Sequence, residues 1–287
     1  SAAVRAARYL KERDLVLTQG YHGWADWCVP NKNGVPRQVQ SCTSGWSGFT
    51  MFRAWDQAAV IVEPDSVEVL MSGGLARLRS ECDRVDALLI FDEVLTGFRV
   101  PDFWYSKWKG VIPDLITAGK AVANGYSCAF VAGPEKFMRI FGGDIAVSGT
   151  YLGETIPLAA ALATVRKYKQ EPVIERLWEV GGWIKDAWTD ETRKLGLDIP
   201  LAGYNSLLLP KYRSLEERTL FTQEMFRRGI CMTTTFFATY AHTEEDVELT
   251  CKAIRESLGV VASAGDDPAS LVEGPIVQMG FRKMTEL

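Results

Sequence analysis

Two residues of opposite charge, Asp92 and Lys120, each follow a short apolar run of the chain. Asp92 comes directly after the run at 88–91, and Lys120 closes a second run that starts near residue 114. Short apolar runs bounded by polar residues or glycine predict buried strands. The carboxyl ends of parallel strands meet at one edge of a sheet, where their side chains line a crevice. The sequence therefore predicts that a carboxylate and an amine share one crevice.

A carboxylate and an amine in one crevice suit a small set of reactions. A lysine amine can form a Schiff base with an aldehyde, and a carboxylate can hold a protonated ring nitrogen. A cofactor such as pyridoxal phosphate needs both groups. Taken singly, Lys120 is equally consistent with a solvated loop lysine and Asp92 with a helix cap. Their joint position after buried strands favours the cofactor site.

Two other motifs compete with this interpretation. A glycine precedes Lys120, as in a phosphate-binding loop. However, Asp114 and Ala121 stand where that loop needs a glycine and a Ser or Thr. The segment 125–129 resembles the nucleophile elbow of hydrolases, which lies between a strand and a helix. Because the serine of this segment is predicted to open a strand, we set the elbow aside.

The first part of the chain alternates predicted strands and helices. The predicted strands are 14–19, 58–62, 88–91, 114–117 and 127–133, and the predicted helices are 1–13, 72–86 and 157–168. Strand–helix–strand units imply parallel neighbours joined by right-handed crossovers. The residues at 28–54, rich in glycine and proline, are expected to form an irregular loop.

The pattern changes at Glu171. Helices are predicted at 173–195, 215–228 and 243–257, with short strands around 204–209 and 230–235. Thr243 precedes three acidic residues, which is typical of a capped helix start. This α+β pattern differs from the first part, so we expect a large domain at 1–170 and a smaller C-terminal domain at 171–287.

The composition indicates a globular protein. The net charge of −4 provides no basic field that would attract nucleic acid or an anionic membrane. No apolar stretch is long enough to span a bilayer. The six cysteines are scattered without a CxxC pair, which predicts reduced thiols and a cytoplasmic protein. With only two histidines, no metal site is expected.

The segment 91–99, followed by 113–120, closely resembles class III pyridoxal-phosphate aminotransferases. Within them it is most similar to the glutamate-1-semialdehyde aminotransferase branch. Further segments match the family in the same order at 20–23, 61–64 and 149–150. The resemblance extends to about residue 260. It implies a fold-type-I enzyme, with a mostly parallel α/β large domain and a C-terminal α+β domain.

The resemblance also implies roles for individual residues. Lys120 would form the Schiff base with the cofactor and then move the substrate proton. Asp92 would pair with the pyridine nitrogen and keep it protonated. Tyr21 would stack on one face of the cofactor ring and Val94 would pack on the other. The remaining implied cofactor-binding residues are His22, Glu63 and Thr150.

Thr150 carries a further implication. In the family, the residue at this position reaches the cofactor phosphate of the neighbouring subunit, so a homodimer with shared active sites is expected. The family also has a phosphate-binding turn before the helix that matches 1–13. The chain opens with that helix, so we expect an N-terminally incomplete sequence.

The expected function is pyridoxal phosphate-dependent amino transfer between a small amino donor and a keto or aldehyde acceptor. The substrate would be an amino acid, an amino sugar or a related amine. The segment 153–157 departs from the glutamate-1-semialdehyde enzymes and resembles homologues from sugar and natural-product pathways. A 2,1-aminomutase remains an alternative, because both reactions begin in the same way. A second alternative is a homologue or fragment that dimerises without catalysis.

Overall fold

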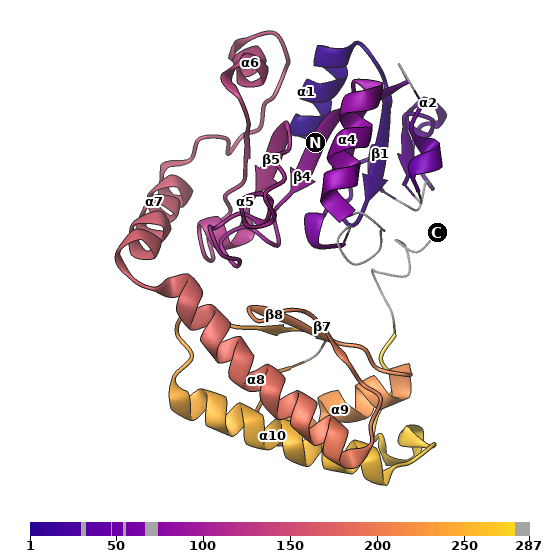
Figure 1. Ribbon diagram of the computed structural model, residues 1–287, viewed down its shortest axis with the longest axis vertical. Helices are drawn as coiled ribbons and strands as arrows, with labels where there is room; N and C mark the ends of the chain where they lie inside the picture. The colour runs from indigo at the N-terminus through magenta and orange to yellow at the C-terminus, as the bar shows by residue number, and fades with distance from the viewer. Residues whose placement is uncertain (30–32, 47, 54–55, 67–73, 233, 279–287) are drawn as a thin grey trace. The chain divides into compact units, whose positions relative to one another are not determined.

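The computed structural model describes residues 1–29, 33–46, 48–53, 56–66, 74–232 and 234–278 of the chain (Figure 1). These residues form two compact units. The first is Ser1–Gln170, and the second begins at Glu171. No helix in the described ranges is both long enough and apolar enough to cross a membrane.

The first unit is built on a sheet that has six strands among the described residues, in the order β2-β1-β3-β4-β5-β6. The strands are β1 (Leu15–Gln19), β2 (Thr43–Gly45), β3 (Gln57–Val62), β4 (Leu88–Asp92), β5 (Leu115–Ala118) and β6 (Phe130–Ala132). All neighbours pair in parallel except β5 and β6, which are antiparallel. Every residue of β3 and β4 is buried, as expected for parallel strands that are covered on both faces. The predicted mostly parallel α/β fold is confirmed.

Helices and 3-10 turns connect these strands. The helices are α1 (Ala2–Lys11), α2 (Arg37–Gln40), α4 (Gly74–Val85), α5 (Tyr105–Lys109), α6 (Glu135–Met138) and α7 (Thr155–Gln170), with 3-10 turns η1 (Phe49–Met51), η2 (Lys120–Val122) and η3 (Arg139–Gly142). Of these, α1 and α4 pack against the sheet. The buried residues of α4 are Leu75, Leu78, Cys82 and Val85, which recur at helical spacing. Figure 1 shows α4 running alongside the strands that it connects, β3 and β4.

Two expectations for this unit are wrong. The segment expected to be an irregular loop contains α2 and the edge strand β2, which pairs in parallel with β1. Because β2 reads Thr-Ser-Gly and forms through backbone pairing alone, no apolar run reveals it. The strand expected at 127–133 is only Phe130–Ala132, half-buried and antiparallel. Ser127 lies before this strand, in a stretch without regular structure that follows a turn at 123–125.

The second unit is α+β. Its helices are α8 (Val173–Leu195), α9 (Leu215–Arg227), α10 (Glu244–Ser263) and the turn η4 (Pro268–Leu271), and its strands are β7 (Leu201–Tyr204), β8 (Leu207–Pro210) and β9 (Phe236–Phe237). The three strands pair antiparallel. The strand expected around 204–209 is thus the hairpin of β7 and β8, and the next strand lies C-terminal to the expected 230–235. Thr243 and Asp246 form a capping box at the start of α10.

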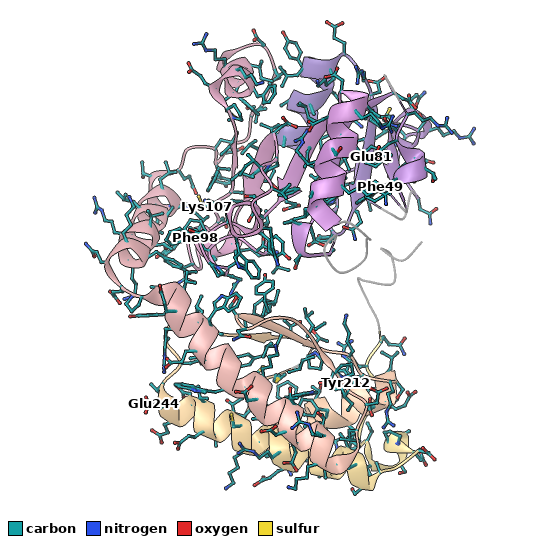
Figure 2. The ribbon with its side chains drawn as sticks, in the orientation of Figure 1. Phe49, Glu81, Phe98, Lys107, Tyr212 and Glu244 are labelled. Carbon is teal, nitrogen blue, oxygen red and sulfur yellow. The ribbon has the colours of Figure 1, made fainter. Side chains whose placement is uncertain are left out.

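Aromatic side chains form the centre of this second unit. The ring of Trp188 lies 5.0 Å from that of Phe221, and Tyr212, labelled in Figure 2, lies 5.8 Å from Phe221. Trp188 is buried, and its indole N–H donates to the carbonyl oxygen of Ile199 at 2.8 Å. Burial of these large rings contributes strongly to the stability of the unit.

Candidate active site

Asp92 lies at the carboxyl end of β4, where it is paired in register with Thr117 of β5. Its carboxylate is buried, with 8% of the residue exposed. The hydroxyl of Thr117 donates to Asp92 Oδ1 at 3.1 Å, and the backbone N–H of Val94 donates to the same oxygen at 3.2 Å. His22 Nδ1 lies 2.8 Å from Asp92 Oδ2. The carboxylate is therefore held in one orientation from both sides.

The loop after β1 brings His22 to this carboxylate. Gly20 opens the loop with φ of 97°, a conformation that side chains other than glycine rarely adopt. A Cβ on Gly20 would also lie 2.5 Å from Glu63 Oε2. The N–H of Tyr21 donates to that same Glu63 oxygen at 2.9 Å. Glu63, at the end of β3, thus fixes the loop, and burial raises the pKa of its carboxyl.

A cavity of about 380 Å³ opens beside Asp92. Three of the predicted site residues, His22, Asp92 and Val94, line this cavity, and so does Thr117. Much of the remaining wall is apolar, with Ile61, Ala118, Ala129, Phe130 and Val131. Ser1, the N-cap of α1, and the first helical residues, Ala2 to Val4, form another part of it. Backbone N–H groups in the first turn of a helix have no partner within the helix, so this part of the wall suits an anion.

Lys120 follows β5 and opens the turn η2. Its backbone has φ of 47°, in the left-handed region that residues other than glycine seldom occupy. Its side chain is exposed and is absent from the cavity wall. Because β5 runs parallel to β4 and ends just before Lys120, the backbone of Lys120 lies at the same edge of the sheet as Asp92. The assignment of Lys120 as the Schiff-base lysine stays a prediction.

The other predicted residues lie outside the cavity wall. Tyr21 is 39% exposed and reaches the site through its backbone contact with Glu63. Thr150 is exposed and precedes Leu152, which does line the cavity. The stacking role of Tyr21 and the phosphate role of Thr150 therefore remain predictions.

Glu93, the neighbour of Asp92, has a different function. Its carboxylate accepts hydrogen bonds from the N–H groups of Tyr105 and Ser106 at 2.6 and 3.0 Å and from the hydroxyl of Thr96 at 3.2 Å. Tyr105 and Ser106 open α5, so the carboxylate satisfies N–H groups at that helix start. Burial raises the pKa of Glu93 despite these donors. Of the two adjacent acids, only Asp92 faces the cavity.

The family profile of class-III aminotransferases matches residues 39–199, more than half of the chain. The chain belongs to this family. The resemblance drawn from the sequence is confirmed, and so is its cofactor, since class-III aminotransferases use pyridoxal phosphate. In the described residues, no group of three or more His, Cys, Asp and Glu side chains is arranged to hold a metal.

Class-III aminotransferases of several kinds resemble this chain. The 3-aminobutyryl-CoA aminotransferase of Cloacimonas acidaminovorans is 29% identical over 90% of the chain and 68% of its own length. The glutamate-1-semialdehyde 2,1-aminomutase of Archaeoglobus fulgidus is 30% identical over 90% of the chain and 72% of its own length. The solved internal aldimine form of the FumI protein of Sphingopyxis sp. MTA144 has a TM-score of 0.83 and 25% identity, covering 91% of this chain and 68% of that one.

The residues around the cavity fit pyridoxal phosphate. A flat aromatic ring with a protonated nitrogen needs an apolar slot that ends at a carboxylate, and the wall around Asp92 provides this combination. The amino-terminal turn of α1 suits the phosphate. Two residues of this arrangement were not predicted from the sequence. Thr117 is a single polar residue inside an apolar run, and Gln19 contributes only its backbone carbonyl to His22, at 3.1 Å.

Proposed function

We propose that this chain is a pyridoxal phosphate-dependent aminotransferase whose cofactor ring is held in the Asp92 cavity. The observation that carries the proposal is the carboxylate itself: buried, oriented by Thr117, Val94 and His22, and open to an apolar slot. A buried carboxylate is costly unless it is paired with a positive charge. A protonated ring nitrogen supplies that charge.

Each of the proposed site residues has its own role in the reaction. When bound, the cofactor withdraws electrons from the substrate carbon that loses a proton. Asp92 would keep the ring nitrogen protonated, Val94 would pack against one face of the ring, and Tyr21 would cover the other. Lys120 would hold the cofactor through its amine and move the proton at the substrate carbon. Glu63 fixes the Tyr21 loop.

We also propose that the two units correspond to a cofactor-binding domain at 1–170 and a smaller domain at 171–287.

Amino donors and keto or aldehyde acceptors are the substrates of the family. The free state of all six cysteines supports a cytoplasmic location.

The proposed active unit is a homodimer. The helix α7 buries only Pro157 in the single chain, while Ile156, Leu158 and Leu162 are 66%, 54% and 50% exposed. One side of α7 contacts the cluster of Phe98, Val122 and Ala123, whose Phe98 is labelled in Figure 2. The exposed leucines on α7 favour a second copy as the partner. This arrangement leaves Thr150, just before α7, free to reach the partner's cofactor phosphate.

Visible absorbance tests the cofactor proposal. The purified chain mixed with pyridoxal phosphate is expected to develop a visible band that is lost in Lys120→Ala. Lys107→Ala is the matched control, since Lys107 is exposed and forms an ion pair with Asp102 at the surface. Asp92→Asn is expected to weaken cofactor binding at least tenfold, equivalent to about 1.4 kcal/mol. A chain that stays colourless, or equal loss in Lys107→Ala, would contradict the assignment.

A 2,1-aminomutase is the second candidate, favoured by the 30% identity with the Archaeoglobus fulgidus enzyme. A mutase moves the amino group within one molecule and needs no second substrate, whereas a transaminase needs a donor and an acceptor. Turnover that depends on both added substrates supports amino transfer. Turnover of a single amino aldehyde with no added acceptor supports the mutase.

A further inference from the structure

The backbone of Lys120 is held in a conformation that a lysine rarely adopts. Its φ of 47° lies in the left-handed region, and Asn124, at the other end of the same turn, has φ of 42°. The N–H groups of Ala123 and Asn124 donate to the carbonyl oxygen of Lys120 at 3.4 and 3.2 Å and close the turn. A strained backbone persists only where the surrounding structure determines its position. The contacts of this turn therefore determine how the chain presents Lys120.

The residues that follow Lys120 anchor the turn. Val122 and Ala123 are 3% and 2% exposed, and they form one buried cluster with Phe98. Lys120 itself is exposed. The buried part of the turn thus lies directly after the lysine and belongs to the same cluster as Phe98.

Phe98 is itself left-handed, with φ of 64°. A bulky residue in this region is an outlier, so its backbone must be held by its neighbours. The N–H of Phe98 donates to the carbonyl oxygen of Phe103 at 2.7 Å, and the carbonyl oxygen of Phe98 accepts from the hydroxyl of Tyr168 at 2.8 Å. Phe103 belongs to the same loop, whereas Tyr168 lies 70 residues away in the sequence, on α7.

Tyr168 contacts the ring of Phe98 as well as its carbonyl oxygen. The two rings meet edge to face, with centroids 5.5 Å apart and an angle of 89° between their planes. This is a favoured arrangement of aromatic pairs. Ala161 and Val165 of α7 pack against the same buried cluster, and Figure 2 shows Phe98 beside this helix. The helix therefore fixes Phe98 through a hydrogen bond and through packing.

We propose that Tyr168 is a positioning residue for Lys120. Its hydroxyl fixes the left-handed backbone of Phe98, and the Phe98 side chain holds the buried part of the turn that begins with the lysine. Because α7 also carries the face of the proposed dimer, the same contact joins that face to the lysine turn. The inference rests on the proposed function for the role of Lys120, while the coupling of Tyr168 to the turn is a property of the chain alone.

Amide hydrogen exchange of the full chain without cofactor tests this coupling. Tyr168→Phe removes the hydroxyl and keeps the ring, so peptides that cover 120–124 are expected to exchange about tenfold faster. Thr164→Val is the matched control, because the Thr164 hydroxyl donates to the carbonyl oxygen of Ala160 within α7, and it should leave the exchange at 120–124 unchanged.

The buried strand β3 is the internal reference for general stability, and its exchange should be the same in all three proteins. Unchanged exchange at 120–124 in Tyr168→Phe would overturn the inference. Equal acceleration in β3 would overturn it as well, because the hydroxyl would then stabilise the whole unit rather than the lysine turn.

Mixing with pyridoxal phosphate tests the effect on the lysine itself. At saturating pyridoxal phosphate, the visible band of Tyr168→Phe is expected to form about tenfold more slowly, since a small displacement of a reacting group is costly. The half-saturating concentration should change by less than about twofold, because Tyr168 is absent from the cavity wall. Thr164→Val should match the natural chain in both quantities.

The two measurements separate this inference from the proposed function. Faster exchange at 120–124 together with an unchanged rate of band formation in Tyr168→Phe would overturn the positioning role. Faster exchange in a chain that stays colourless with pyridoxal phosphate would confirm the coupling of Tyr168 to the turn and contradict only the proposed function.

Discussion

Glu93 and Asp92 differ in what surrounds their side chains rather than in their chemistry. The Glu93 carboxylate receives three hydrogen bonds from the segment 96–106, with two on Oε2 and one on Oε1. Because these donors come from a loop and from the start of α5, Glu93 holds the backbone that follows β4. Asp92 accepts hydrogen bonds from the Thr117 hydroxyl on β5 and from the Val94 N–H in the turn after β4, it contacts His22, and it lines the cavity. Glu93 therefore has a structural role, whereas Asp92 is available for the proposed chemistry.

Glu93→Gln is expected to lower the free energy of unfolding by roughly 1–3 kcal/mol. The amide oxygen can replace one carboxylate oxygen, but the NH₂ group then faces the N–H of Ser106 or of Tyr105 and leaves that donor unpaired. Urea denaturation measures the loss. The control Glu135→Gln changes an acid that is 78% exposed, and a change below about 1 kcal/mol is expected there. Equal losses in the two variants would contradict the structural role of Glu93.

Glu63 gives a prediction for the dependence of stability on pH. Burial raises its pKa, against the hydrogen bond from Tyr21 and the attraction of His22, and the charges of Asp65 and Asp92 raise it further. A raised pKa means that the folded state binds the proton more tightly than the unfolded chain. The contribution of Glu63 to stability is therefore largest below the ordinary carboxyl pKa and is lost as pH rises through the folded value.

Glu63→Gln removes this titration while keeping an oxygen that can accept from Tyr21. At neutral pH, the variant is expected to match or exceed the stability of the natural chain. As the pH falls to the ordinary carboxyl range, the natural chain gains on the variant by about 1.4 kcal/mol for each unit by which its pKa is raised. Denaturation curves of both proteins at the two pH values measure the difference. A difference in unfolding free energy that stays constant across pH would contradict this account.

At the scale of elements, apolar runs and helical spacing predict most of what positions the site. The strands β3 and β4 follow from their uninterrupted apolar residues, and α8 (Val173–Leu195) has the bounds expected from its spacing. The edge strand β2 could not be predicted, because backbone pairing with β1 leaves no mark on side-chain pattern. The contact between His22 and Asp92 could not be predicted either, because it depends on how the loop after β1 folds back onto the end of β4.

The helix α8 contains a pair of adjacent glycines that differ only in their tertiary surroundings. A Cβ on Gly181 would lie 1.5 Å from the carbonyl oxygen of Asn205, in the turn between β7 and β8. A Cβ on Gly182 would lie 3.3 Å from the movable side-chain nitrogen of the same residue. The helix can approach the hairpin so closely only where it has no side chain. Sequence spacing alone does not distinguish these two positions.

Gly181→Ala is therefore expected to destabilise the second unit by about 3 kcal/mol or more, because the backbone of α8 or of the hairpin must move. Gly182→Ala is expected to change stability by no more than about 1 kcal/mol, since alanine favours the helix and the nearby amide can turn aside. Circular dichroism during urea denaturation compares the two variants. Similar midpoints for both would show that Gly181 is not at a close contact.

At the scale of the whole molecule, α7 carries apolar side chains that the single chain leaves exposed. This helix is rich in alanine and leucine, yet within the single chain it buries only Pro157. The helix contacts the rest of the first unit through the hydroxyl of Tyr168, which donates to the carbonyl oxygen of Phe98 at 2.8 Å. Tyr151 and Leu152, just before the helix, are 75% and 63% exposed. Exposed apolar residues in one stretch are typical of a surface covered by another protein.

Leu162→Glu is expected to convert the proposed dimer to monomers, because it places a charge within the apolar face that a second copy would bury. The matched control is Leu249→Glu on α10, since both leucines are 50% exposed. Sedimentation velocity at a fixed protein concentration measures the mass of each variant. The dimer should be lost in the first variant and kept in the second. Cofactor binding should weaken together with dimer loss if Thr150 reaches the phosphate of the partner, whereas a monomeric natural chain would refute the shared site.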